Sequence, residues 1–308
     1  MRFFVLLTWF AVFLAQPAAA QISSPHLPNG QVSKLQQLEQ RLSAMATENP
    51  GEYGIAAMDL ETGKTVSVNG NQLFPMASTM KIAVAAAYLA EVDAGRRSLD
   101  ETIGGVTAGT LMDAMITRSS NSATDMLIET LGGPAPVDRW LRGHGLTGIR
   151  VDRTIAQLLS ARRDLRDVRD SSTPTAMLGL LRLVDTGNAL KPQSRALLMD
   201  MMYRCKTGSN RIRGILPAGA RVENKTGTLS GYTGDVGYLT FPSGRRIAVA
   251  FFGRGGENRP AVIATAARMI YDAFGAEMSE EHAGTFSARR AAFAPPATAS
   301  GRAPALIN

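Results

Sequence analysis

A serine and a lysine three residues apart, Ser78 and Lys81 in FPMASTMK, stand at the start of an alanine-rich segment. On a helix this spacing places both side chains on one face, one turn apart. A serine hydroxyl is a weak nucleophile unless a base stands beside it, and a desolvated lysine with a lowered pKa can be that base. The free N–H groups at a helix start also stabilise developing negative charge. Because such a pair also arises by chance, it indicates acyl transfer only together with further motifs.

A second polar group, Arg118 to Ser122 (RSSNS), lies between two predicted helices. Here Ser119 can relay a proton, and Asn121 can hold a substrate carbonyl. The alternative is that these residues only cap the junction between the helices.

The tripeptide Lys-Thr-Gly occurs twice, at 206–208 and at 225–227. The first copy follows the predicted helix SRALLMDMMYRC, where lysine favours the negative end of the dipole and glycine supplies a left-handed cap. The second copy lies within an alternating strand, so Lys225 can project into a seam between lobes while the backbone hydrogen-bonds a bound chain. The first copy is therefore predicted to be a helix terminus, and the second to serve chemistry.

The elements that must position these residues follow from hydrophobic spacing. Helices are expected at about 33–46, 79–93, 109–118, 122–131, 135–142, 174–184, 194–205 and 260–274. Strands are expected in YGIAAMDL, TVSVNG, ARVENKTG, GDVGYLTF and RRIAVAFFG. This order predicts an α/β (α+β) fold, in which a five-stranded antiparallel sheet is flanked by the terminal helices and an all-helical lobe, about 75–217, is inserted between its strands. Ligands favour the seam between such lobes.

The first twenty residues, MRFFVLLTWFAVFLAQPAAA, are typical of a secretory signal peptide cleaved before Gln21, which predicts a periplasmic or secreted protein. Their apolar run is shorter than the ~20 residues of a membrane span, so no membrane-spanning segment is expected. We expect one catalytic domain over 21–282. The tail at 283–308, rich in Ala and Pro, is expected to be disordered.

Composition restricts the function further. Cys205 is the only cysteine, so no internal disulfide is possible, and the three histidines lack metal-ligand spacing. We expect no metal, no cofactor and a monomer. The formal charge is +7, and arginines concentrate between 150 and 169. They alternate with aspartates and lack interleaved aromatics, which favours a salt-bridged loop over a nucleic-acid surface, and attraction of a small anionic substrate is compatible with the charge.

Ser-x-x-Lys, a Ser-x-Asn group and Lys-Thr-Gly occur here in the order found in class A β-lactamases and penicillin-binding proteins. The chain resembles the class A β-lactamase family from about Leu35 to Phe274. The segment FPMASTMK resembles the nucleophile motif of the family. The segment NSATDMLIETLGG resembles the helix after the second motif, and RDSSTPTAM resembles the end of the omega loop.

The resemblance implies a role for each motif residue. Ser78 would be the acylated nucleophile, and Lys81 would be its base or proton relay. Ser119 would pass the proton to the leaving nitrogen. Asn121 would bind the substrate amide. Backbone N–H groups of Ser78 and Thr228 would form the oxyanion hole.

The resemblance also implies a pocket for a substrate carboxylate, formed by Lys225 and Thr226. Family members that lack an arginine on the following strand complete this pocket with one from the preceding segment. In this chain that expectation falls on Arg211, while Arg213 is equally compatible with a structural ion pair.

Two positions depart from the family pattern. Ser120 replaces an aspartate that chiefly supports its loop. The omega loop, Val151–Asp170, contains no glutamate, and the place of the water-activating glutamate falls on Ile155 or Gln157, depending on the alignment. Arg153 and Asp170 match the pair that fixes the ends of the loop.

Without that glutamate, acylation at Ser78 can proceed through Lys81, but hydrolysis of a penicilloyl ester is expected to be slow unless Asp152, Asp164 or Asp167 replaces it. The leading hypothesis is a serine hydrolase of the β-lactamase type. The alternatives are a penicillin-binding or sensor protein that stays acylated, and a peptidase or esterase acting on cell-wall peptides or small esters. A structural envelope protein is disfavoured, because the motif side chains are intact.

Overall fold

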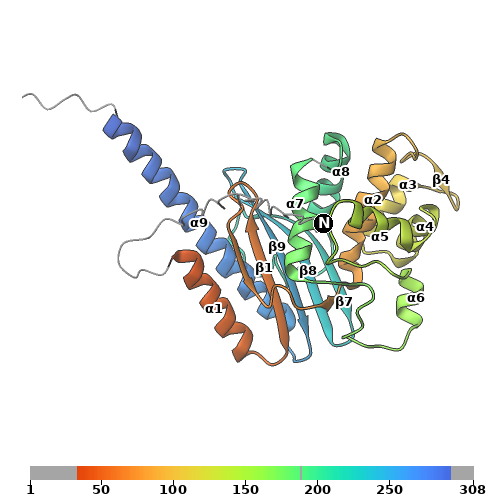
Figure 1. The fold of residues 1–308 in the computed structure, drawn as a ribbon, viewed down its shortest axis with the longest axis horizontal. Coiled ribbons are helices and arrows are strands. Elements are labelled where there is room, and N and C mark those ends of the chain that lie inside the picture. The colour runs from red at the N-terminus through yellow and green to blue at the C-terminus, as the bar shows by residue number, and fades with distance from the viewer. Residues whose placement is uncertain (1–32, 188, 293–308) are drawn as a thin grey trace, which may run out of the picture. The chain divides into compact units, whose positions relative to one another are not determined.

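The computed structural model describes residues 33–187 and 189–292, with side chains up to 280. The predicted signal peptide at 1–20, its cleavage site and the last part of the predicted tail, 293–308, lie outside the described residues. Figure 1 shows the order of the elements along the chain.

A five-stranded antiparallel sheet is built from both ends of the described chain, and its order is β2-β1-β9-β8-β7. The strands are β1 (Glu52–Asp59), β2 (Thr65–Val68), β7 (Arg221–Leu229), β8 (Tyr232–Thr240) and β9 (Arg246–Arg254). Two short ladders pair β3 (Phe74–Pro75) with β6 (Ser171–Ser172) and β4 (Thr102–Ile103) with β5 (Val106–Thr107). The five-stranded sheet predicted from the sequence is thus confirmed.

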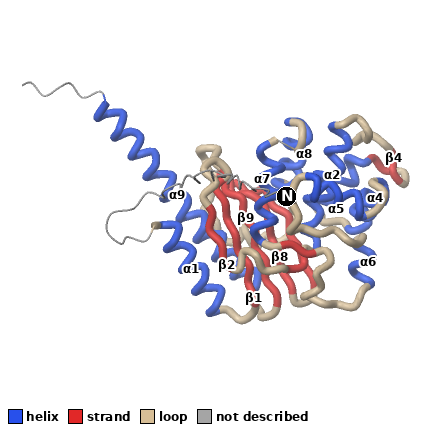
Figure 2. Tube along the Cα trace, viewed as in Figure 1, coloured by secondary structure: helices blue, strands red, loops and turns tan. Residues whose placement is uncertain are grey.

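Two helices cover one face of the sheet, α1 (Lys34–Glu48) and α9 (Arg259–Ala292), as Figure 2 shows. Leu38 and Leu42 of α1 pack with Ile270 and Phe274 of α9 in one buried cluster that includes Phe251 of the sheet. The prediction that the last helix ends near Phe274 is wrong. The helix continues to Ala292, so the first ten residues of the predicted disordered tail, 283–292, are helical.

The inserted lobe is helical, as predicted. It contains η1 (Ala77–Met80), α2 (Lys81–Asp93), α3 (Ala108–Thr117), α4 (Asn121–Thr130), α5 (Pro134–Gly143), α6 (Ile155–Ser160), α7 (Pro174–Thr186) and α8 (Pro192–Tyr203). The cap predicted at Thr173 is present: its side chain accepts from Ala176 N at 3.0 Å, and Pro174 takes the first helical position. The short helix α6 was not predicted.

Helix α2 is the centre of the lobe. Every residue from Lys81 to Leu89 is buried, because alanines let the neighbouring helices approach closely while Ile82, Val84 and Leu89 fill the space between them. This burial fixes the start of α2, and with it the serine and lysine of the first motif. No helix within the described ranges is long and apolar enough to cross a membrane.

Candidate active site

Ser78 lies in the 3₁₀ turn η1, which leads directly into α2. Its side chain is half-buried, while Ala77 and Thr79 on either side are buried. Ala77 has φ +49°, a left-handed conformation that costs a non-glycine residue about 1–2 kcal/mol. The packed surroundings thus hold the turn in a strained shape that presents the hydroxyl at a helix start.

Lys81 is fully buried, one turn after the serine. Its Nζ donates to the backbone oxygen of Ser119 at 2.8 Å, to Oδ1 of Asn121 at 2.8 Å and to Oγ of Ser119 at 3.3 Å. Burial, together with the positive charge of Lys225, lowers the pKa of Lys81 to about 7. A lysine in this state is neutral in about half of the molecules near pH 7, as a general base requires.

Lys225, on strand β7, also donates a hydrogen bond to Ser119. Its Nζ donates to Oγ of Ser119 at 2.9 Å and to the carbonyl oxygen of Thr226 at 2.9 Å. Burial lowers the pKa of Lys225 to about 8. The hydroxyl of Ser119 therefore accepts from both lysines, which occupies its lone pairs and leaves its own O–H to donate to a third partner.

The loop that carries Ser119 is shaped by its backbone. Ser119 has φ +58°, and Ser120 follows as the N-cap of α4, its Oγ accepting from Ala123 N at 3.2 Å. The prediction of a capped junction is therefore correct for Ser120, while its neighbours Ser119 and Asn121 point to the lysines. Asn121 is otherwise exposed.

Ser78 Oγ makes no hydrogen bond within the described part of the chain. The hydrogen-bond network of Lys81, Ser119 and Lys225 therefore does not include it. Catalytic hydrogen bonds are often long or absent without substrate and form only when it is bound.

Gly227, the last residue of the second Lys-Thr-Gly, is needed because the two lobes touch there. A Cβ at this position would lie 2.6 Å from the backbone oxygen of Met76 and 3.2 Å from Cβ of Ala77. No side chain fits in this gap. Strand β7 therefore lies directly against the turn that carries Ser78, and the motif's glycine sets their separation.

The first Lys-Thr-Gly follows α8, as predicted, but it is not the terminus of that helix. Helix α8 ends at Tyr203 with Arg204 as its C-cap, so Gly208, although it has φ +65°, does not supply the predicted cap. However, Thr207 Oγ1 lies 2.5 Å from Thr226 Oγ1, so the first copy directly supports the second. Sequence analysis assigned no contact to Thr207, although the repeated motif drew attention to it.

Arg211 lies along strand β7. Its guanidinium donates to Oγ1 of Thr228 at 2.7 Å and to the backbone oxygens of Gly227 and Gly234 at 3.1 and 2.9 Å. Arg213 has a structural role instead, because it donates to Oδ1 of Asn224 and to the backbone oxygen of Val222. Thr228 is exposed.

The omega loop is closed by the pair that its sequence predicted. Arg153 Nε donates to Asp170 Oδ2 at 2.5 Å, and Asp170 Oδ1 accepts from the backbone N–H groups of Asp152 and Arg153. Asp170 is fully buried and has φ +50°. The carboxylate therefore joins the two ends of the loop.

Asp170→Ala is expected to reduce the free energy of unfolding by about 3 kcal/mol, because it removes the buried acceptor of Arg153 Nε and of two backbone N–H groups, while, among the described residues, Arg153 keeps only its pair with Asp167. Urea denaturation of both proteins measures this loss. Asp164→Ala is the matched control, since that exposed carboxylate accepts one bond from the backbone of Arg166. Equal midpoints for the two variants would contradict a structural role for Asp170.

Asp152, Asp164 and Asp167, which sequence analysis considered as possible bases, have other partners. Asp152 pairs with Arg150 at 2.6 Å, Asp167 pairs with Arg169 at 2.8 Å, and Asp164 accepts the bond from Arg166. No hydrogen bond joins any of them to Ser78 or Lys81 within the described residues.

Ile155 and Gln157, the two residues on which the resemblance places the family's glutamate, have structural roles in this chain. Ile155 is buried, and Gln157 forms a capping box with Thr154 at the start of α6. The carboxylate of Asp125, on α4, accepts from the backbone N–H groups of Ile155 and Ala156 at 2.6 and 2.9 Å. The negative charge of Asp125 also raises the pKa of Lys81 against the larger effect of burial. Sequence analysis missed this link between α4 and the omega loop.

No group of three His, Cys, Asp or Glu side chains suited to a metal ion occurs among the described residues. The site contains a serine hydroxyl, two lysines with lowered pKa values and the donors around them.

The chain is similar to solved structures of β-lactamases, among them class A enzymes. An ancestral class A β-lactamase is 35% identical, with a TM-score of 0.73, over 77% of this chain and 100% of that chain. The last common ancestor of Gram-negative bacteria class A β-lactamase is 36% identical, with a TM-score of 0.73, over 77% and 99%. A β-lactamase from Chitinophaga pinensis is 30% identical, with a TM-score of 0.72, over 77% and 99%. The fold is therefore that of the class A β-lactamases.

The model of the β-lactamase enzyme family matches residues 37–274. The chain belongs to this family. The resemblance inferred from Ser78, Lys81 and Lys225 is thereby confirmed at the level of family and fold.

Proposed function

We propose that this protein is a serine hydrolase that forms an acyl-enzyme at Ser78 with β-lactams. The observation that carries the proposal is the hydroxyl of Ser119, which accepts from Lys81 at 3.3 Å and from Lys225 at 2.9 Å. An acceptor held between two buried amines, next to a serine at a helix start, suits the transfer of a proton from nucleophile to leaving group.

In the proposed reaction, neutral Lys81 takes the proton of Ser78 as its oxygen attacks the lactam carbonyl. The backbone N–H groups of Ser78 and Thr228 stabilise the oxyanion. The lactam nitrogen then leaves with the proton of Ser119, which is replaced by the proton that Lys81 received. Family membership, the pKa of Lys81 and its contact with Ser119 support this sequence.

The substrate carboxylate is proposed to bind at Lys225, Thr226 and Arg211. Lys225 is the source of charge, and its pKa of about 8 leaves it cationic in most molecules at neutral pH. Arg211 adds a second positive group along the same strand, where it already contacts Thr228.

Release of the acyl group is proposed to be slow. Ile155 and Gln157 cannot act as bases, and the aspartates of the omega loop are held in ion pairs or backbone contacts. These observations favour, as the second candidate function, a penicillin-binding or sensor protein that remains acylated. A peptidase or esterase remains the third candidate. Export to the periplasm is part of the proposal and rests on the predicted signal sequence.

Intact-mass analysis after addition of benzylpenicillin tests the proposal. We expect a one-to-one adduct that disappears over minutes to hours, and no adduct with Ser78→Ala. A permanent adduct would indicate the binding protein, and no adduct at all would indicate another substrate class. Labelling that survives Ser78→Ala would contradict the assignment of the nucleophile. The Lys206→Ala variant, in the first Lys-Thr-Gly, is the control and should be labelled like the wild type.

A further inference from the structure

The arginines of the omega loop do not all have the same role. Four of the six between 150 and 169 are paired with carboxylates: Arg150 with Asp152, Arg153 with Asp170, Arg166 with Glu52, and Arg169 with Asp167. The prediction of a salt-bridged loop therefore holds for these four. It does not hold for Arg162 and Arg163, which have no carboxylate within 4.0 Å among the described residues and are exposed.

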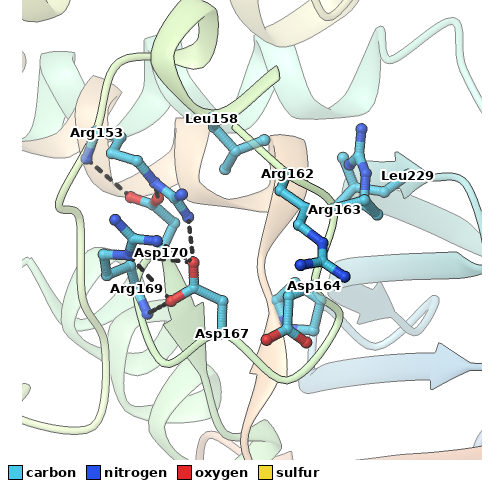
Figure 3. Close-up of a pocket in the computed structure, with 10 residues that line it drawn as sticks. Arg153, Leu158, Arg162, Arg163, Asp164, Asp167, Arg169, Asp170 and Leu229 are labelled. Atoms are coloured by element: carbon cyan, nitrogen blue, oxygen red, sulfur yellow. Dashed lines mark hydrogen bonds and ion pairs between the residues drawn. The ribbon is translucent and has the colours of Figure 1, made fainter. Parts of the chain in front are cut away.

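Arg162 and Arg163 line a pocket next to the candidate active site. Figure 3 shows them on the same side of this pocket as Leu229, with the ion pairs of Arg153 and Arg169 on the other side. Pro75 also lines the pocket. Leu229 belongs to strand β7 and directly follows Thr228, and Pro75 is three residues before Ser78, so the pocket is lined in part by chain neighbours of two candidate site residues.

The segment that carries these two arginines is anchored. Arg254 of β9 donates to the backbone oxygen of Leu165 at 3.1 Å, and the Leu165 side chain packs against Gly231, where an added Cβ would lie 3.1 Å away. Arg162 and Arg163 are therefore presented from a fixed backbone beside the cleft. Asp164 also lines this pocket, so its negative charge partly offsets the positive charges of Arg162 and Arg163.

We propose that Arg162 and Arg163 form a second anion-binding position, which selects substrates whose acyl side chain carries a carboxylate in addition to the one held by Lys225. This inference rests on the proposed function. The interior of the pocket is only about 20 Å³, room for one water molecule, so the carboxylate binds the guanidinium groups at the mouth. Guanidinium groups suit this purpose because they bind carboxylates in a bidentate way.

Two penicillins that differ by one carboxylate test the proposal: benzylpenicillin and α-carboxybenzylpenicillin. The rate of acylation, measured by intact mass as a second-order constant for each, gives a preference ratio for the wild type. In Arg162→Gln/Arg163→Gln we expect this ratio to fall about 2- to 5-fold, the size typical of an exposed charge pair. The rate for benzylpenicillin itself should change little. The wild-type ratio should also fall as salt is added.

Arg139→Gln, which removes an exposed arginine of α5, is the control and should leave the ratio unchanged. An unchanged ratio in the double variant, with both penicillins still acylating Ser78, would overturn the inference and leave the proposed function standing. If neither penicillin acylates the wild type, the inference and the proposed function fail together.

Discussion

Lys81→Gln is expected to slow acylation of Ser78 about 10²- to 10⁴-fold, the usual contribution of a positioned general base, equivalent to roughly 3–5 kcal/mol of barrier. Glutamine is of similar length and keeps donors for Ser119 and Asn121, but it cannot accept the proton. The rate of adduct formation with benzylpenicillin, followed by rapid quenching and intact mass, measures the change.

The pH dependence follows from the two lysines. Lys81 acts as a base only when neutral, so acylation should rise with pH through about 7. Lys225 binds the substrate carboxylate only when protonated, so kcat/KM should fall above about pH 8. A narrow maximum between these values is therefore expected in the wild type, and Lys81→Gln should lose the rise on its acid side.

Lys206→Gln is the matched control for Lys81→Gln, because Lys206 is an exposed lysine of the first Lys-Thr-Gly. Its rate and pH profile should equal those of the wild type. Acylation at the wild-type rate by Lys81→Gln, with normal folding, would mean that another group takes the proton of Ser78.

Ile155→Glu is expected to speed loss of the acyl group about 10²- to 10⁴-fold. One alignment with the family places residue 155 where class A β-lactamases carry the water-activating glutamate. The backbone N–H of Ile155 bonds to Asp125, and this nearby negative charge together with burial would raise the pKa of a new carboxyl towards neutrality, where a general base works best. The decay of the benzylpenicillin adduct measures the rate.

Ile155→Gln separates base catalysis from loosening of the loop. Glutamine has the size and polarity of glutamate but cannot act as a base. Any cost of burying a polar group is shared by Ile155→Glu and Ile155→Gln. Equal decay rates for the two would show that residue 155 does not face the acyl group. Gln157→Glu tests the other alignment, and there we expect little change, because Gln157 is committed to the cap of α6.

Much of the fold could be predicted because local signals agreed with the tertiary structure. The cap at Thr173 and the buried helix after Ser78 each reflect a pattern readable within about ten residues. The alternation predicted for the strand that carries Lys225 does not appear in its burial, because residues 222–227 of β7 are all buried. The convergence of Lys81, Ser119 and Lys225 could be predicted only through the order of the motifs. Spacing along the chain does not reveal contacts between lobes.

The features that were missed depend on partners far apart in sequence or on weak local signals. Helix α6 is six residues long, and its start is held by Asp125, thirty residues earlier. The role of Thr207 depends on its contact with Thr226, which is nineteen residues away in the sequence. The extension of α9 to Ala292 contradicted a composition rule, since a segment rich in alanine is compatible with a helix as well as with disorder.

The contact at Gly227, where β7 meets the turn holding Ser78, has a thermal consequence. With backbone and side-chain atoms already touching there, neither lobe can rotate towards the other, and opening the cleft would require breaking the core on which both depend. Acylating capacity should therefore persist on heating until the whole molecule melts, rather than fading at a lower temperature.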